Sequence, residues 1–234
     1  MKYSIVTGYW CGEGGFRGGD TTSKAEFFEL WLSNTLKYSE PSRIFVVNPN
    51  SLVLPTDLHE NTCSWIHLDH NFGHVHDMHG SDYRHKFCGW TQSFILGAML
   101  AYANNTDLIY KEQDCLAFGP WVQRLYEDME KNGKKMLLGM ESFPGMRIEQ
   151  SLVIIKHDFI NEFLKELFDI PFPDGGLGKV LPEAKFAAIM DKRKEVGYMS
   201  FGVGRARPIL FDAPFYVQQL SKEEIDFLKN IGLV

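Results

Sequence analysis

Residues 107–116 of the chain read DLIYKEQDCL, a short apolar run followed at once by two acids. The run from Asp107 to Tyr110 predicts a central β-strand, and Glu112 and Asp114 come directly after it. Side chains two residues apart on an extended segment point to the same face, so these two carboxylates can converge on one ion. Open α/β folds bind their ligands at the carboxyl ends of the strands. The stretch therefore predicts a cation-binding turn at the end of a buried strand.

Two other acid-x-acid pairs occur, Asp128/Glu130 and Glu224/Asp226. Both fall in predicted helices, where residues two apart point in different directions. Carboxylate oxygens suit a hard cation such as Mn²⁺ or Mg²⁺, which can also hold a diphosphate. On spacing alone, two solvated acids in a turn remain the alternative interpretation of Glu112 and Asp114.

Strands and helices alternate on both sides of this stretch. Apolar runs predict strands at 3–7, 43–48, 64–68, 135–140 and 151–155, with 196–201 as a further one. Residues 141–150, between two of these strands, are expected to form a loop. Helical periodicity and capping signals predict helices at 23–36, 90–104, 120–129, 158–168, from 182 and from 221. We expect their buried faces to include Leu36, Met99, Tyr102 and Phe168. The alternation predicts an α/β fold with a mostly parallel sheet, and a more irregular last third that packs on the sheet or covers it.

Composition limits the classes of protein. The chain has 234 residues, 44% of them hydrophobic, which suits one globular domain. Its net charge of −6 gives no general attraction to nucleic acid or to acidic membranes. The four cysteines are far apart, which favours reduced thiols in a cytoplasmic protein. The longest apolar run, residues 94–103, is too short to span a bilayer, and no signal peptide is visible.

The glycine-rich segment after the first strand matches neither common nucleotide-binding fingerprint. Gly14 and Gly19 have the outer spacing of a phosphate-binding loop, but Asp20 stands where that loop needs lysine. Gly12 and Gly14 fit the dinucleotide pattern, whereas Arg17 takes the place of its third glycine. We therefore reject both readings.

Six of the eight histidines lie between His67 and His85, interleaved with aspartates. Imidazole and carboxylate are ligands of zinc and iron, so this cluster predicts a metal-dependent hydrolase as one alternative. No compact ligand spacing such as His-Glu-x-x-His is present. A polar rim or surface loop is the other interpretation.

The stretch from Asp107 to Leu116 resembles the strand and D-x-D motif of GT-A glycosyltransferases, with Glu112 in place of the first aspartate. Asn71-Phe72-Gly73 resembles the N-x-G turn that precedes the long helix in many of these enzymes. The N-terminal strand Ile5-Val6-Thr7 is similar to their first nucleotide-contacting strand. The resemblance implies a GT-A-like, Rossmann-like sheet flanked by helices. It also implies one domain, with residues 1–155 as the nucleotide-sugar half and 156–234 as the acceptor or lid half.

The resemblance also implies a reaction and a set of site residues. A sugar would move from a nucleotide diphosphate sugar, most commonly UDP-linked in the family, to a hydroxyl of a glycan or other acceptor. Asp114, with Glu112, would hold Mn²⁺ or Mg²⁺ and so neutralise the leaving diphosphate. An inverting enzyme also needs a base, for which the candidates are Glu183, Glu149 and Asp174; a retaining enzyme does not. The implied nucleotide-sugar contacts are Thr7, Gly8, Tyr9, Asn48, Arg84, Lys86, Glu112, Gln113 and Arg205.

Three functions thus remain open at the level of sequence: a metal-dependent glycosyltransferase, a zinc or iron hydrolase built on the histidines, and a non-catalytic carbohydrate-binding module. The transferase predicts Mn²⁺ binding that strengthens with a nucleotide diphosphate. The hydrolase predicts tight zinc or iron binding that depends on His70 or His74. A binding module needs neither Asp114 nor a metal.

Overall fold

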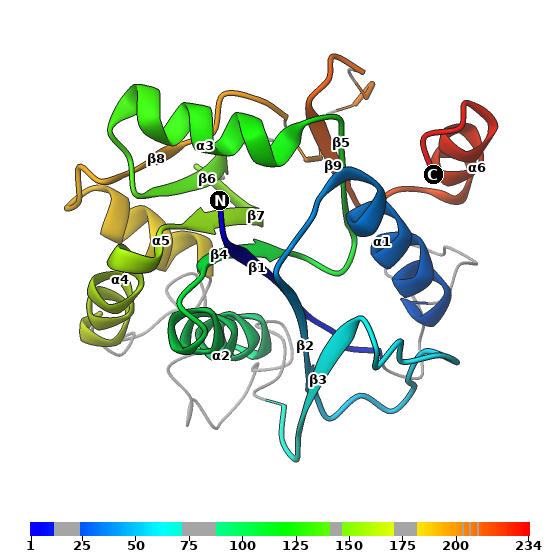
Figure 1. The fold of residues 1–234 in the computed structure, drawn as a ribbon, viewed down its shortest axis with the longest axis horizontal. Helices are drawn as coiled ribbons and strands as arrows, with labels where there is room; N and C mark the ends of the chain where they lie inside the picture. Colours follow the sequence, from blue (N-terminus) through cyan, green and yellow to red (C-terminus); the bar gives the residue numbers. More distant parts are fainter. Residues whose placement is uncertain are drawn as a thin grey trace.

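The computed structural model describes residues 1–11, 24–71, 88–140, 147–170, 182–202, 204–205, 207–209 and 211–234. A seven-stranded sheet in the order β3-β2-β1-β4-β7-β6-β8 forms the centre of the fold (Figure 1). Its strands are β1 (Tyr3–Gly8), β2 (Arg43–Pro49), β3 (Cys63–Leu68), β4 (Asp107–Lys111), β6 (Met136–Met140), β7 (Ile148–Ile155) and β8 (Val196–Tyr198).

The sheet is mostly parallel, as the alternation of elements predicted. β3, β2, β1 and β4 run parallel to their neighbours, and β8 is parallel to β6. Only β7 reverses direction, because it pairs antiparallel with β4 on one side and with β6 on the other. The carboxyl ends of β1, β2 and β4 therefore meet at one edge of the sheet.

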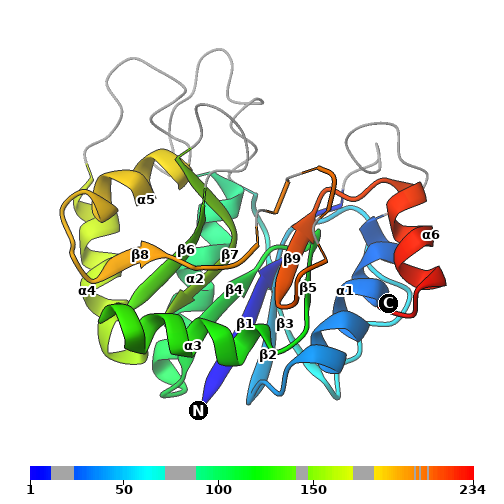
Figure 2. The ribbon, with the colours of Figure 1, turned by 90° about the horizontal axis from the view of Figure 1, so that it is seen from above.

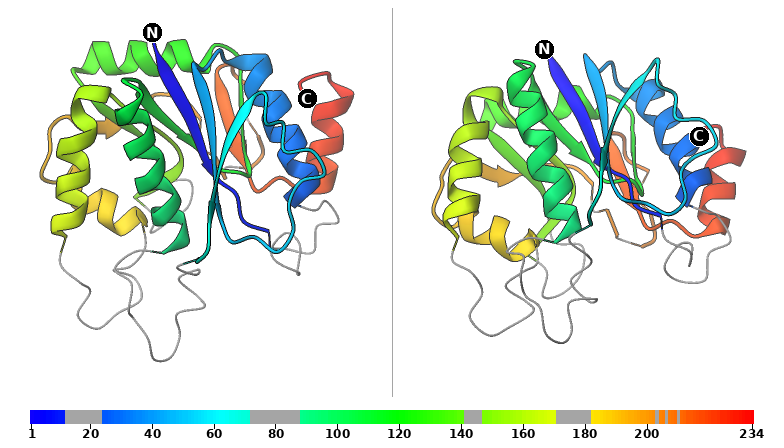
Figure 3. Two further views of the ribbon diagram at one scale, coloured as in Figure 1. Left: turned by 60° about the horizontal axis from the view of Figure 1, so that its bottom comes forward. Right: turned by 90° about the horizontal axis from the view of Figure 1, so that it is seen from below.

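Helices cover both faces of the sheet (Figure 2). Consecutive residues of β1 show why, since Ile5 packs into the core on one face and Val6 into the core on the other. α2 and α4 lie side by side on the Val6 face, in green and yellow-green in Figure 3. The helices of the Val6 face are α2 (Gly89–Ala103), α4 (His157–Asp169) and α5 (Pro182–Met190); those of the Ile5 face are α1 (Lys24–Tyr38), α3 (Trp121–Asn132) and α6 (Lys222–Asn230). None of the helices in these described ranges has both the length and the apolar character needed to cross a bilayer.

A second, two-stranded sheet was not expected from the sequence. β5 (Cys115–Phe118) and β9 (Phe215–Gln218) pair antiparallel and lie on the Ile5 face (Figure 1). Both are only four residues long, too short for periodicity to identify them as strands. Their pairing brings residues about one hundred positions apart into contact directly behind the Glu112–Asp114 turn.

Other expectations need correction at the ends of elements and on helix surfaces. β7 begins at Ile148, within a segment expected to be a loop, and β8 ends at Tyr198. Four side chains expected on buried helix faces are largely exposed: Leu36, Met99, Tyr102 and Phe168. α2 is apolar around most of its circumference, so its sequence does not show which side faces solvent.

The contact between α2 and β1 depends on Gly97. A Cβ placed there would overlap the side chain of Val6, which is completely buried and, as a β-branched residue, has little rotamer freedom. We expect Gly97→Ala to lower the free energy of unfolding by roughly 1–3 kcal/mol in urea denaturation, because overpacking outweighs the better helix propensity of alanine.

A double variant tests this explanation. Val6→Ala alone leaves a cavity, but in the Gly97→Ala background it removes the overlapping atoms. The two substitutions should therefore cost less together than the sum of their separate effects. A Gly97→Ala protein more stable than wild type would contradict the close packing.

Candidate active site

The turn after β4 places the two predicted metal ligands beside β7. The Glu112 backbone N–H donates to the Ser151 carbonyl oxygen at 2.8 Å, and the Cys115 N–H donates to the Glu112 carbonyl oxygen at 2.9 Å. These bonds hold the turn between the end of β4, the adjacent β7 and the start of β5. The Asp114 carboxylate lies close enough to Glu112 to raise the pKa of the Glu112 carboxyl.

Three further charged side chains, predicted as site residues on separate grounds, converge on this turn. Glu149 comes from β7, Glu183 from the first turn of α5, and Arg205 from the segment between β8 and β9. All three act electrostatically on Glu112. Among the described residues, four acidic side chains and the Arg205 guanidinium thus lie within electrostatic range of one another at the carboxyl end of β4.

The structure corrects the expected position of Glu149, which lies in β7 and not in a loop. Its side chain is completely buried, opposite Gly139 of β6 where the register of the two strands shifts. Its Oε2 is 3.4 Å from Nε of Arg205. A buried carboxylate needs such a partner because removal of a charge from water is expensive.

Burial and charge repulsion act together on two of the acids. Burial raises the pKa of Glu112 well above its ordinary value of 4.5; Asp114 and Glu149 raise it further, and Arg205 opposes them. Burial also raises the pKa of Glu183, with a further contribution from Glu149, while Arg205 and the Gln150 side chain lower it. Within the described part of the chain, the acids of the cluster therefore outnumber the cations that act on them, which favours the neutral form of Glu112 and Glu183.

Tyr216 of β9 is a neighbour of the cluster that the sequence reasoning missed. Its side chain occupies space left open by Gly139, Gly202 and Gly204, since a Cβ at any of these positions would meet the tyrosine ring or hydroxyl. Burial raises the pKa of Tyr216, and Glu149 raises it further. No signal could have found it, because β9 itself was not predicted.

The end of β1 is joined to the neighbouring strands by hydrogen bonds. The Gly8 N–H donates to the Tyr110 hydroxyl at 3.2 Å, and a Cβ at Gly8 would meet Ser93 and that same hydroxyl. The Gln113 side chain bonds the Trp10 main chain twice: its Oε1 accepts from the N–H at 3.0 Å, and its Nε2 donates to the carbonyl at 3.3 Å. The acidic turn and the end of β1 are thereby linked.

Three other predicted nucleotide-sugar contacts lie at this edge. Thr7 is buried, and Tyr9 is buried with its hydroxyl donating to the Val53 carbonyl at 3.1 Å. Asn48 uses both ends of its amide within the protein: Oδ1 accepts from the Ser51 N–H at 2.8 Å, and Nδ2 lies 3.0 Å from Nδ1 of His67. Their contacts with a nucleotide sugar stay predictions.

The remaining predicted positions lie outside the described residues. These are Arg84, Lys86, Asp174, the glycine-rich segment from Gly12 to Gly19, and the histidines from His74 to His85. Within the described ranges, no group of three or more histidine, cysteine or acidic side chains has the spacing to hold a metal ion.

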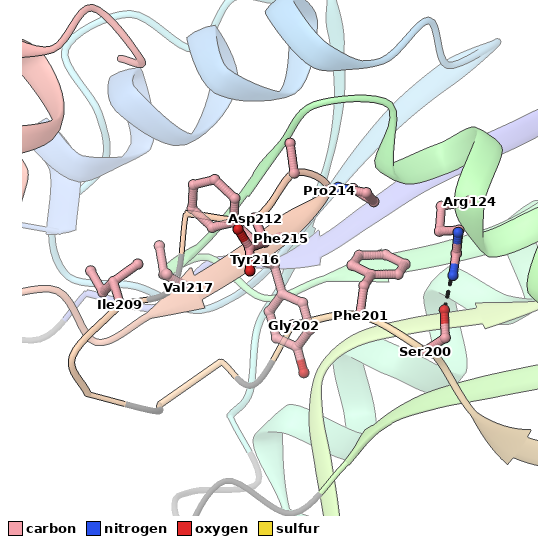
Figure 4. A pocket seen from close by; sticks show the side chains of 11 residues that line it. Arg124, Ser200, Phe201, Gly202, Ile209, Asp212, Pro214, Phe215, Tyr216 and Val217 are labelled. Atoms are coloured by element: carbon pink, nitrogen blue, oxygen red, sulfur yellow. Dashed lines mark hydrogen bonds between the residues drawn. The ribbon is translucent and has the colours of Figure 1, made fainter.

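A cavity of about 340 Å³ lies next to the cluster, on the side of β9 and α3 (Figure 4). Its wall is mainly apolar, with Phe201 and Phe215 on it, and Arg124 lies at one end with its Nε donating to Oγ of Ser200 at 3.0 Å. Tyr216 belongs both to this wall and to the surroundings of Glu149. The cavity and the acidic cluster are therefore neighbours that share one side chain.

No protein-family model and no curated protein sequence matches this chain, whereas solved structures resemble it in fold. An enzyme described as a glucose-1-phosphate thymidylyltransferase from Bacillus anthracis aligns over 100% of this chain and 96% of its own, with a TM-score of 0.55 and 8% identity. The glycosyltransferase GlyE of Streptococcus pneumoniae aligns over 96% of this chain and 56% of its own, with a TM-score of 0.53 and 11% identity. The chain thus spans little more than half of GlyE. These likenesses confirm the expected glycosyltransferase-like α/β fold of this chain.

Proposed function

We propose that this protein is a metal-dependent glycosyltransferase that uses a nucleotide diphosphate sugar, with UDP as the expected nucleotide. One observation carries the proposal: Glu112, Asp114, Glu149, Glu183 and Arg205 converge at the carboxyl end of β4. This is the edge at which open α/β folds bind ligands. The fold shared with the glycosyltransferase GlyE supports the same reaction class.

The acidic turn fits a divalent cation by the chemistry of its side chains. Burial and mutual repulsion make the ionised form of Glu112 unfavourable, and a nearby cation would relieve both effects. Asp114 and Glu112 would hold Mn²⁺ or Mg²⁺, both of which prefer carboxylate oxygens. Such an ion supplies Lewis acidity to a departing diphosphate.

We assign the donor to the edge formed by β1, β4 and the segment before β9. Gly8, which a side chain would crowd, and Thr7 lie at the end of β1, and Arg205 is the cation of the described cluster. A guanidinium stabilises the negative charge that develops on a leaving diphosphate. Arg84 and Lys86 remain expected contributors from the segment before α2.

Glu183 is the better candidate for the base that takes the acceptor proton. Glu149 is completely buried and paired with Arg205, which suits a carboxylate that orients a guanidinium. Glu183 has a pKa raised by burial, and a carboxylate with a pKa closer to neutrality is the more effective base. The cavity on the other side of Tyr216 adds room for an acceptor near these acids.

We also propose a cytoplasmic location. All four cysteines, Cys11, Cys63, Cys88 and Cys115, are described, buried and not joined in disulfides. Proteins of reducing compartments keep their cysteines in this state.

A thermal-shift panel of nucleotides with and without Mn²⁺ tests the function. A ligand that binds only the folded state raises the melting temperature, by about 5–10 °C for a chain of this size at a concentration near 100 Kd. We expect UDP with Mn²⁺ to give such a shift, and UDP in EDTA to give little or none. Glu183→Gln should keep the shift but lose transfer to an acceptor.

Other outcomes would favour other functions. A shift with dTTP, together with release of pyrophosphate from a sugar phosphate and a nucleoside triphosphate, would indicate nucleotidyl transfer instead. Tight zinc binding that is lost in His70→Ala would support the hydrolase. The absence of a shift with every nucleotide and nucleotide sugar would contradict the proposal.

A further inference from the structure

A buried lysine directly precedes the acidic turn. Lys111 is the last residue of β4, and its side chain is completely buried against α1. Its Nζ donates to Oδ1 of Asn34 at 2.8 Å and to Oγ1 of Thr35 at 2.8 Å, and it lies 5.0 Å from the centre of the Trp31 ring. Both hydrogen-bond acceptors are neutral groups.

Asn34 connects this lysine to the strand on the other side of the turn. The same Oδ1 that accepts from Lys111 also accepts from the backbone N–H of Ala117 at 3.0 Å. Lys111 ends β4, and Ala117 lies inside β5. One oxygen atom on α1 therefore joins the residue before the Glu112–Asp114 pair to a residue just after it.

Stability alone does not account for a lysine at this position. Burial of an ammonium group among neutral partners is expensive, and a well-packed apolar side chain of similar length is often as stable or more so. An apolar residue would fill the space but would not bind Asn34.

We infer that Lys111 and Asn34 form a positioning pair, which holds the Glu112–Asp114 turn against α1 and so fixes the approach of its two carboxylates to a cation and diphosphate. The inference rests on the proposed transferase function. Neither residue is catalytic, since the Lys111 ammonium donates to Asn34 and Thr35 of α1 and not to the acidic cluster. Their effect is transmitted through the two ends of the turn.

Asn34 offers a conservative replacement. Its Nδ2 is buried and has no hydrogen-bond partner within the described part of the chain, so only the oxygen makes these contacts. Asn34→Asp keeps an oxygen acceptor for both Lys111 and Ala117, whereas Asn34→Leu removes it. Lys111→Met removes the ammonium but leaves the 2.7 Å bond from Thr35 Oγ1 to the Trp31 carbonyl, so we expect this variant to fold. Oδ1 of Asn34 loses one of its two donors, so its bond to the Ala117 N–H is held less firmly.

We expect Lys111→Met and Asn34→Leu to lower kcat by about 10- to 100-fold and to raise the Mn²⁺ concentration needed for half-maximal UDP binding. Asn34→Asp should remain within about threefold of wild type in both measurements. A second readout needs neither metal nor substrate: by NMR, the Ala117 amide should exchange faster in Lys111→Met and Asn34→Leu, but not in Asn34→Asp.

Ser4→Ala is the matched control, because it removes a buried hydrogen bond, 2.7 Å from Ser4 Oγ to Thr106 Oγ1, at the opposite end of the sheet. It should lower stability without changing kcat or the metal requirement. If folded Lys111→Met has wild-type kcat, metal requirement and Ala117 exchange, the positioning role is wrong. If wild type itself shows no Mn²⁺-dependent UDP binding, the proposed function is wrong. In that case the Ala117 exchange rates alone decide whether Lys111 and Asn34 hold the turn against α1.

Discussion

Replacement of Asp114 by alanine should reduce sugar transfer by about 10²- to 10³-fold, the size of effect seen when one preorganised electrostatic contact to a developing charge is lost. The reason lies in the position of the side chain, at the end of β4 beside Glu112 and within a cluster of four carboxylates. The Mn²⁺-dependent thermal shift with UDP should disappear in the same variant. Initial rates with a UDP-sugar, together with calorimetric titration of UDP in Mn²⁺, measure both effects.

Asp226→Ala provides the control for this result. Asp226 is the second member of another acid-x-acid pair, but it is exposed on α6, remote in sequence from the turn. Its removal should leave both rate and binding unchanged. Retention of more than about one tenth of the activity in Asp114→Ala would show that the acidic turn does not hold the cation.

Glu112→Gln should make the metal-free protein more stable at neutral and alkaline pH. Burial, Asp114 and Glu149 all raise the pKa of Glu112 above 4.5, so the folded state keeps this proton at pH values where the unfolded state has lost it. Stability contributed by the protonated group is complete below pH 4.5 and is lost as the pH rises toward the folded pKa. A neutral glutamine does not ionise and escapes this loss. We therefore expect Glu112→Gln to unfold at higher urea concentration than wild type at pH 8.

Urea unfolding in EDTA from pH 5 to pH 9 measures this effect. The free energy of unfolding of wild type should fall more steeply with pH than that of Glu112→Gln, and the two curves should approach each other near pH 5. Addition of Mn²⁺ should stabilise wild type more than the variant, because the ion compensates a charge that glutamine lacks. A variant less stable than wild type at pH 8 would mean that Glu112 is favourably paired as an anion.

If Glu112→Gln is more stable than wild type but less active, Glu112 shows the pattern expected of a residue in a functional site. Like charges held together in a buried cluster destabilise the protein unless a ligand neutralises them. Glu112→Gln and Asp114→Ala thus test one physical arrangement from two sides, one through folding and the other through the reaction.

Much of the fold could be predicted because its signals are local. The apolar runs of β1, β2 and β4 are strongly strand-forming, and α3 and α4 show clear amphipathic periodicity. The elements that were missed or misassigned have weak local signals. β5 and β9 are four residues long, and the uniformly apolar α2 does not show its buried side, so Met99 and Tyr102 were expected in the core and are exposed.

The candidate site also has residues that local sequence predicts and residues that only the fold brings together. Glu112 and Asp114 could be identified because they directly follow the apolar run of β4 in sequence. The structure places them in a turn closed by the Cys115 N–H and the Glu112 carbonyl, and not on an extended segment. Glu149 was named among the possible bases but placed in a loop, whereas it lies in β7 and faces Arg205. Tyr216 was not named at all, since only its pairing in β9 brings it to Glu149.

By itself, then, the chain's order of apolar and polar residues determined a mostly parallel α/β sheet and an acidic turn at the end of its central strand. Only packing decided that Glu149, Glu183 and Arg205 would surround that turn, and that Lys111 and Asn34 would support it from α1. Contacts between residues far apart in sequence depend on how strands and helices pack against one another, and no local pattern records that arrangement.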